Sequence, residues 1–203
     1  MKSIKIILTT ALSFWMVQSF AQTPLESLRV MFATSPVSME CDYSTMIQNT
    51  KVAGHSEILV QGDMYTMRGN GLEIFCDGTD VWTVDESAQE VIIESCSLQD
   101  CDYMSNPALL LADLDSVFKV DGSRSVGSGN VEYTLAARTT CGVSKAVVVL
   151  AQDGKIVKAD FIMDDGTALE VNVASMKKAE EKQMSFFSPG RKFGSDWIVT
   201  DLR

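Results

Sequence analysis

Few side chains in this 203-residue chain could perform covalent or acid–base chemistry. A nucleophile at neutral pH needs a nearby base, and histidine is the side chain that most often serves as one. His55 is the only histidine; it begins a strand-like run, and no GxSxG motif or neighbouring cysteine accompanies it. We therefore interpret His55 as an ordinary strand-end residue and expect no catalytic residues and no enzymatic activity.

Five cysteines could support disulfide or metal chemistry: Cys41, Cys76, Cys96, Cys101 and Cys141. Cys96 and Cys101 flank the tetrapeptide SLQD, so a bridge between them closes a short loop and is the candidate disulfide. Cys41 and Cys76 lie in strand-like runs, where a buried cysteine packs as a small hydrophobic residue. The chain has no C-x-x-C pair and a single histidine, too few ligands for a zinc site. We expect neither a metal nor a cofactor.

The acidic residues are numerous, but they do not form a recognisable catalytic pair. Asp164 and Asp165 precede Gly166 in a hairpin-type turn, where aspartate is expected for its hydrogen bonds to the backbone. The chain also lacks a phosphate loop, a dinucleotide fingerprint and calcium-loop spacing. Its formal net charge of -10 argues against binding to nucleic acid or to an anionic membrane surface. These features favour a binding protein over an enzyme.

The first 21 residues have the layout of a secretory signal peptide. Two lysines precede an apolar run over residues 6–17, and Ser19-Phe20-Ala21 follows as a cleavage site. The run is shorter than the roughly 20 apolar residues that span a bilayer. We expect cleavage after Ala21, export as a soluble periplasmic protein, and a single domain over residues 22–203. The cysteines then lie in the exported part, where disulfides persist.

Two helices are expected in the mature chain. The first covers residues 24–34, between a Thr-Pro start and a Ser-Pro stop, with Leu25, Leu28 and Phe32 on one face. The second covers residues 105–114, which are rich in leucine and have a proline in the first turn. Two helices are too few for a fold in which helical crossovers connect parallel strands.

Short strand-like runs make up most of the remaining chain. Residues 37–48 and 55–61 form two such runs, joined by the turn-like segment NTKVAG over residues 49–54. Five runs follow Val117, and the segments SVGSGN, QDGK and DDGT between them are typical hairpin connectors. The regular spacing of strands and turns predicts an antiparallel sandwich or barrel.

The stretch GLEIFCDGTDVWTVDESAQEVIIE, residues 71–94, is apolar on both faces of its first hairpin. Antiparallel pairing of Cys76 with Val81 puts Leu72, Ile74, Cys76 and Val81 on one face and Phe75, Trp82 and Val84 on the other. The simpler interpretation is that a helix packs on one face and strands curl over the other. The alternative is that one face, which we expect to be that of Ile74, meets a bound guest.

The segment FCDGTDVWTVDESAQEVIIE resembles a motif of the LolA family, the periplasmic carriers of outer-membrane lipoproteins. In that family a D-G-x-x-x-W-x-Y/V-D/N sequence is followed by a strand. Other segments agree in their order: the amphipathic first helix, GDMYTMR as a strand, NPALLLADL as a lid helix, and FFSPGRKFGSDWIVTDLR as the terminal F-x-P-P-x-G-V-x-V segment. The resemblance covers the mature chain and is closest to LolA-like proteins of the Bacteroidetes type.

The resemblance implies an α+β, mainly antiparallel fold: a half-open curved β-barrel with a helical lid and a hydrophobic cavity for acyl chains. The implied cavity and lid residues are Leu25, Leu28, Phe32, Tyr65, Met67, Leu72, Ile74, Trp82, Leu109, Leu110 and Leu111. It further implies a monomer whose partners are an acylated lipoprotein or another lipid, an inner-membrane export complex and an outer-membrane acceptor. An alternative on the same fold is a periplasmic regulatory module that senses a lipid or a partner protein.

One departure from the family concerns closure of the lid. In the family an arginine just after the second strand holds the lid helix shut, whereas the corresponding region here reads LVQGDMY and has Gln61-Gly62. Arg68 is the nearest arginine, and nothing in the sequence shows that it substitutes. The resemblance therefore leaves regulated lid closure in doubt.

Overall fold

Helix α1 (Pro24–Thr34) opens the part of the chain that the computed structural model describes, which is residues 22–48, 50–96, 114–138 and 142–203. The side chain of Thr23 caps the helix by accepting a hydrogen bond from the Glu26 N–H at 3.2 Å. Ser35 has an extended backbone and ends the helix. The buried face includes Leu25, Leu28 and Phe32, so the expected first helix and its apolar face are confirmed.

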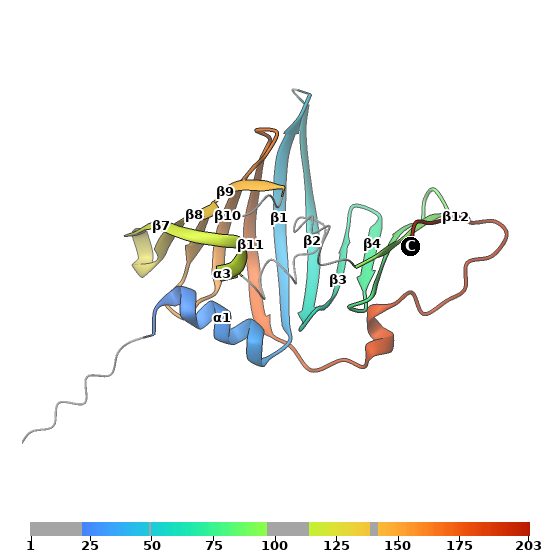
Figure 1. Ribbon diagram of the computed structural model, residues 1–203, viewed down its shortest axis with the longest axis horizontal. Helices are drawn as coiled ribbons and strands as arrows, with labels where there is room; N and C mark the ends of the chain where they lie inside the picture. The colour runs from blue at the N-terminus through green and yellow to red at the C-terminus, as the bar shows by residue number, and fades with distance from the viewer. Residues whose placement is uncertain (1–21, 49, 97–113, 139–141) are drawn as a thin grey trace, which may run out of the picture.

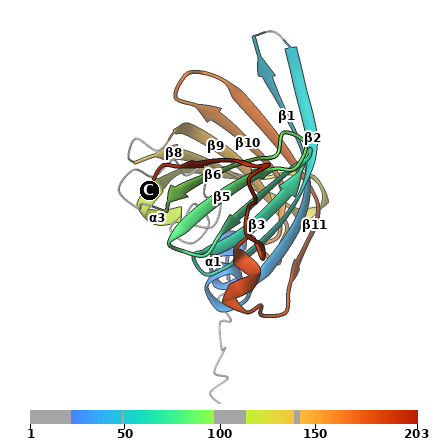
Figure 2. The ribbon, with the colours of Figure 1, turned by 90° about the vertical axis from the view of Figure 1, so that its right-hand side faces the viewer.

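Twelve strands of the described residues form one sheet, in the order β12-β6-β5-β4-β3-β2-β1-β11-β10-β9-β8-β7. Strands β7 and β12 stand at the two ends, so the sheet is not closed, and Figures 1 and 2 show how it curves. Every pairing is antiparallel except that of β12 with β6. The strands are β1 (Val37–Ile47), β2 (Thr50–Gln61), β3 (Met64–Gly69), β4 (Leu72–Cys76), β5 (Asp80–Asp85), β6 (Glu90–Ser95), β7 (Phe118–Ser125), β8 (Val131–Ala137), β9 (Val143–Leu150), β10 (Ile156–Met163), β11 (Ala168–Lys178) and β12 (Ile198–Asp201).

Three short helical segments complete the description: α3 (Leu114–Val117), η1 (Gly127–Gly129) and η2 (Met184–Phe187). The expected second helix, residues 105–114, lies outside the described residues except for its last residue. The expected fold class, a mainly antiparallel and half-open curved sheet with helical cover, is confirmed.

The expected turn over residues 49–54 is wrong. Strand β2 already begins at Thr50, which pairs with Ile47 of β1, and the pairing continues through Val52 and Gly54. The segment looked turn-like because lysine, alanine and glycine have low strand propensity. Its partner strand decides the outcome, because pairing with β1 satisfies the backbone hydrogen bonds of these residues.

The sheet has an inner face, toward which α1 packs, and an outer face (Figure 2). The inner core contains the buried face of α1 and side chains of β1 to β4 and β8 to β11, among them Val37, Tyr65 and Leu150. A separate, smaller core lies on the outer face, where Phe75, Val84, Val91 and Ile93 pack with Trp82, Phe193 and Trp197. The chain therefore covers the two faces with different segments.

Candidate functional site

The hairpin of β4 and β5 has the register expected from the sequence. Cys76 pairs with Val81 and Ile74 pairs with Thr83, whereas Phe75 pairs with Trp82. Because side chains alternate along a strand, Ile74 and Cys76 face the inner core and Trp82 faces the opposite side. Both expected apolar faces are thus present, and each meets a different part of the molecule.

Burial on the inner face decreases along strands β3 and β4, from the row that they share with Val60 of β2. One transverse row contains Val60, Tyr65 and Cys76, which are fully or almost fully buried. The next row, Ile58, Met67 and Ile74, is partly buried, and Leu72 at the start of β4 is 39% exposed. The inner face therefore opens toward the turn between β3 and β4.

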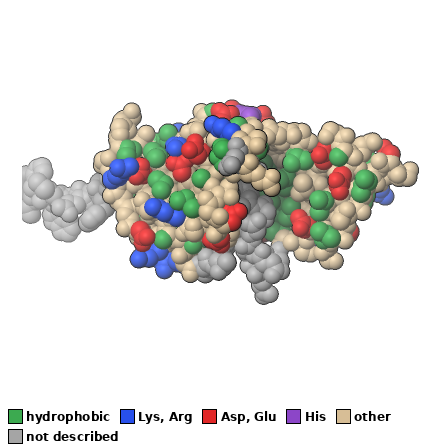
Figure 3. Space-filling view, turned by 90° about the horizontal axis from the view of Figure 1, so that it is seen from above, with side chains coloured by type: hydrophobic (Ala, Val, Ile, Leu, Met, Phe, Trp, Pro, Cys, Tyr) green, Lys and Arg blue, Asp and Glu red, His purple; other side chains and the backbone are tan. Residues whose placement is uncertain are grey.

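Further partly buried residues lie on the inner face beyond strand β1, whose Met39 and Cys41 are buried. Phe161 of β10 and Val171 and Val173 of β11 pack against the inner core without being fully buried. We use the name inner apolar strip for Ile58, Met67, Leu72, Ile74, Phe161, Val171 and Val173. Figure 3 shows hydrophobic side chains gathered beside the hollow in the middle of the molecule. A surface of this kind suits an apolar ligand of variable shape, since its members are flexible or branched aliphatic and aromatic side chains.

The three expected lid residues of α1 belong to the core in this state. Leu25, Leu28 and Phe32 are between 2% and 7% exposed and pack in the inner cluster. The turn between β9 and β10 holds the helix closely, because a Cβ atom on Gly154 would lie 2.5 Å from the backbone nitrogen of Leu28. These side chains would become available to a ligand only after α1 moved.

The sulfur and phenol groups near the strip are poor nucleophiles. Burial, reinforced by the neighbouring thiols of Cys76 and Cys96, raises the pKa of Tyr65 well above its usual range. Burial is also the main reason why the pKa of Cys76 is raised to about 12. Burial, followed by the charge of Asp42, raises the pKa of Cys41. These three groups therefore stay neutral at physiological pH and contribute uncharged surface to the inner face, not a reactive centre.

His55, the single histidine of the chain, lies on the opposite face of the sheet. His55 is exposed, and its Nδ1 lies 3.0 Å from a carboxylate oxygen of Asp42. Both residues belong to the outer side of their strands, since their neighbours Cys41 and Ser56 are buried on the inner side. Among the described residues, no group of three His, Cys, Asp or Glu side chains is placed to hold a metal ion.

Trp82 is the expected cavity residue that needs correction. It lies on the outer face and packs with Phe75 and the C-terminal aromatic residues, because its register partner is Phe75 and not Ile74. It is therefore not part of the inner apolar strip. Leu109, Leu110 and Leu111 and the disulfide partner Cys101 lie outside the described residues, so their expected roles stay predictions.

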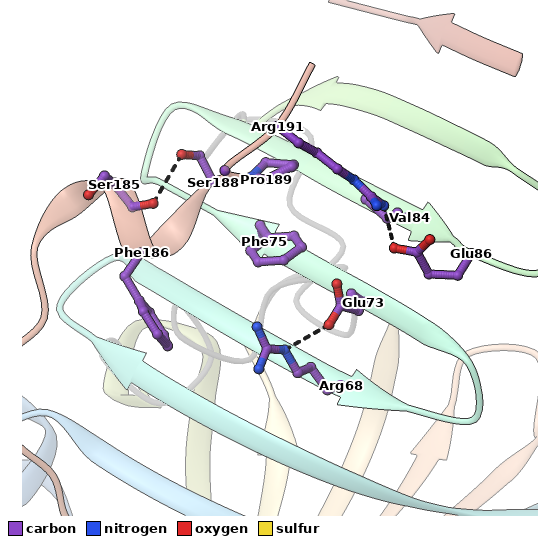
Figure 4. Close-up of a pocket in the computed structure, with 11 residues that line it drawn as sticks. Arg68, Glu73, Phe75, Val84, Glu86, Ser185, Phe186, Ser188, Pro189 and Arg191 are labelled. Atoms are coloured by element: carbon purple, nitrogen blue, oxygen red, sulfur yellow. Dashed lines mark hydrogen bonds and ion pairs between the residues drawn. The ribbon is translucent and has the colours of Figure 1, made fainter. Parts of the chain in front are cut away.

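The C-terminal segment forms a pocket of about 360 Å³ on the outer face, shown in Figure 4. Phe75 lies between two ion pairs, one joining Arg68 to Glu73 at 3.0 Å and the other joining Arg191 to Glu86. The guanidinium of Arg68 also lies over the ring of Phe75, 5.9 Å from its centre. Arg68 is thus engaged on the outer face, so it does not supply the lid-holding contact that the inner face would need.

Gln61 has a structural role that the sequence did not suggest. Its side-chain amide donates to the carbonyl oxygen of Lys182 at 3.0 Å and accepts from the Lys182 N–H at 2.8 Å. This pair of hydrogen bonds fixes the C-terminal segment to the end of β2. The aromatic spacing in FFSPGRKFGSDW is the signal that could have indicated such a cover, since Phe187 is fully buried and the rings of Phe193 and Trp197 pack with their centres 5.0 Å apart.

The fold is similar to that of several solved structures. An uncharacterised conserved protein from Thermus thermophilus is 10% identical with a TM-score of 0.53, covering 86% of this chain and 94% of its own. A LolA superfamily protein from Nitrosomonas europaea is 14% identical with a TM-score of 0.47, covering 84% and 98%. A domain described as an outer membrane lipoprotein-sorting protein, from Vibrio parahaemolyticus, is 11% identical with a TM-score of 0.44, covering 80% and 95%.

These similarities concern the fold alone. No protein-family model and no curated protein matches the chain. Within the described residues, no helix is both long and apolar enough to cross a membrane.

Proposed function

We propose that this protein is a periplasmic carrier that binds the acyl chains of a lipoprotein, or of another lipid, along the inner apolar strip. The observation that carries the proposal is the gradient of burial on the inner face. Tyr65 and Cys76 are sealed in the core, whereas Met67, Ile74 and Leu72 remain partly or largely accessible on the same face. An open sheet that keeps such residues accessible provides apolar surface that its own core does not consume.

The energetics of acyl-chain binding fit a surface without reactive groups. Each methylene transferred from water to an apolar surface contributes about 0.8 kcal/mol. A carrier thus needs contact area and shape tolerance, and methionine and branched side chains provide both. Neutral thiols and a neutral phenol beside the strip are compatible with this task, because no proton or acyl transfer is required.

The proposal agrees with what the sequence resemblance implies. It includes removal of residues 1–21 on export and transfer of the cargo from an inner-membrane donor to an outer-membrane acceptor. The family's lid-holding arginine has no counterpart on the inner face of the described strands that follow β2, where Gln61 and Arg68 both make outer-face contacts. We therefore propose that packing of α1 on the sheet, and not an arginine latch, governs access to the strip.

A fluorescent fatty acid tests the proposal, with Leu72→Gln as the variant and Ile162→Gln as its matched control. Leu72 is 39% exposed on the inner face and Ile162 is 42% exposed on the outer face of β10, so both changes should affect stability to a similar, small extent. We expect Leu72→Gln to weaken probe binding about 10-fold, because about 1.5 kcal/mol of apolar contact is lost. Ile162→Gln should bind like the unchanged protein.

Mass spectrometry of material extracted from the protein, purified from an export-competent host, should identify the natural cargo class. Protein that carries no lipid and also fails to take up the probe would exclude a carrier. A stable complex with one envelope protein, together with absence of probe binding, would instead support the regulatory module on the same fold.

A further inference from the structure

The ends of strands β4 and β6 bring two cysteines together on the inner face. Cys76 is the last residue of β4, and Cys96 follows the last residue of β6. The N–H of Cys96 donates to the carbonyl oxygen of Thr79 at 2.7 Å, which places Cys96 across the turn that follows Cys76. Both side chains pack in the inner cluster, and the thiol of Cys96 is near enough to contribute to the raised pKa of Cys76.

We propose that Cys76 and Cys96 form a disulfide in the exported protein. Strand pairing holds their backbones in place, since β4 pairs with β5 and β5 pairs with β6 along their lengths. A disulfide requires that the two backbones lie close and that the side chains point toward each other, and the turn that carries the Thr79–Cys96 hydrogen bond brings these two residues together. The bridge would fix the end of β6 to the wall that contains Tyr65, at the fully buried edge of the inner face. This inference replaces the bridge between Cys96 and Cys101 that the sequence suggested, and it does not depend on the proposed lipid binding.

The two cysteines differ in exposure, and this difference decides which of them reacts first during oxidation. Cys96 is partly exposed, so a disulfide donor can reach it, whereas Cys76 is fully buried. The donor is a thiol–disulfide oxidoreductase or a small disulfide such as oxidised glutathione. The Cys96 thiolate attacks one donor sulfur, forms a mixed disulfide and releases the other donor sulfur as a thiol.

The second step closes the bridge and balances the reaction. Cys76 loses its proton and attacks the Cys96 sulfur, which releases the second donor sulfur as a thiol. Two protein thiols and one donor disulfide thus give one protein disulfide and two donor thiols, and two electrons pass to the donor. Burial keeps the thiol form of Cys76 favoured, so the second step should be the slower one.

Peptide mapping of the unreduced protein tests the proposal. No lysine or arginine separates residues 69 and 118, so trypsin leaves Cys76, Cys96 and Cys101 in one peptide. A protease that cleaves before aspartate instead releases residues 63–76 with Cys76 and residues 85–99 with Cys96. Protein exported to an oxidising compartment is denatured, its thiols are blocked with N-ethylmaleimide, and it is then digested. We expect the two peptides to be joined and to separate on reduction.

Single serine variants give the matched comparison. Cys76→Ser should remove the joined peptide and leave Cys96 labelled by N-ethylmaleimide, whereas Cys41→Ser, at another buried cysteine, should leave the joined peptide unchanged. Two results from the unchanged protein would overturn the proposal. One is Cys96 joined to Cys101 or to another cysteine, and the other is complete labelling of both Cys76 and Cys96 after incubation with oxidised glutathione.

Discussion

The inner and outer faces of strands β4 and β5 are both apolar, but the chain covers them in different ways. On the outer face, Phe75 and Val84 are sealed by the chain's own C-terminal segment through Phe193 and Trp197. On the inner face, α1 takes part in a core that seals Cys76, whereas Ile74 stays partly exposed and Leu72 largely so. The sheet therefore has a covered apolar core on its outer face and an accessible apolar surface on its inner face.

We call residues 182–203, which pack on the outer face, the outer cover, and compare their contacts with those of α1 on the inner face. Polar interactions hold the outer cover on the sheet at several points. They include the two hydrogen bonds between Gln61 and Lys182 and the ion pair between Arg191 and Glu86. Helix α1 contributes a large apolar face to the inner core and closely approaches Gly154. Apolar packing is not directional, so a helix held in this way can be replaced by an apolar ligand at lower cost than a segment fixed by hydrogen bonds. This difference makes α1 the better candidate for a movable cover.

The largest expected effect comes from breaking the outer cover. Phe187 of η2 is fully buried and stacks edge-to-face on Phe186 at 5.5 Å. Replacing a buried phenylalanine by alanine removes its burial and leaves a cavity, so Phe187→Ala should lower the free energy of unfolding by about 3–5 kcal/mol. Urea denaturation measures the change. Fatty-acid affinity at low temperature should be unaffected, and a weaker affinity without loss of stability would show that the outer cover takes part in ligand binding.

A smaller effect is expected from loosening α1 on the inner face. Gly154 and Gly166 both lie in turns between strands and both have φ of +85°. A Cβ atom at Gly154 would meet the backbone of α1, whereas one at Gly166 would meet nothing within 4 Å. Both alanine variants incur backbone strain of about 1 kcal/mol, and Gly154→Ala adds about 1–3 kcal/mol from overpacking.

Gly154→Ala and Gly166→Ala together also test whether α1 controls access to the inner face. If α1 is the movable cover, Gly154→Ala should increase the rate of fatty-acid uptake in stopped-flow fluorescence, because the helix is held less tightly. Gly166→Ala should leave the uptake rate unchanged. Equal rates in both variants, despite the greater destabilisation by Gly154→Ala, would contradict a role for α1 in access.

The sequence was sufficient to predict the inner face of the hairpin but not the cover of its outer face. The turn between Cys76 and Val81 is short, so local spacing fixed the register and with it the faces of Ile74 and Phe75. The outer cover depends on the parallel pairing of β12 with β6, about a hundred residues apart in the chain. No local pattern encodes such a contact, so the sequence did not show what covers Trp82. The register of the hairpin already placed Trp82 on the face opposite to that of Ile74, and its expected role as a cavity residue came from the resemblance alone.

A second limit concerns residues whose role is set by a neighbouring strand. Gly54 is one example, because a Cβ atom there would meet the side chain of Asn70, which donates to the hydroxyl of Tyr43 at 2.6 Å. The sequence alone suggested a turn at this position, whereas the glycine allows the β3–β4 turn to approach β2. Close approach between segments is a tertiary property, and composition does not reveal it.

The smallest expected effect concerns the end of the outer cover at acid pH. Arg203 binds Asp201 of β12 at 2.6 Å and also Asp80 at the start of β5, so it links the edge strand to the sheet. The hydrogen bonds from Arg203 lower the pKa of the Asp201 carboxyl from 3.8 to about 2. A carboxyl whose pKa is lower in the folded state stabilises that state above its unfolded pKa, and the contribution is lost as the pH falls from about 4 to about 2.

Arg203→Gln should remove this part of the acid dependence. The pair is exposed, so the change in global stability should be close to the error of measurement, and the signal belongs to β12 itself. Hydrogen exchange of the β12 amides should be faster in Arg203→Gln than in the unchanged protein at pH 6, and the difference should shrink toward pH 2. A difference that persists at pH 2 would mean that Arg203 holds the strand through Asp80 or by packing. The carboxylate of Asp201 would then not be the group that fixes β12 to the sheet.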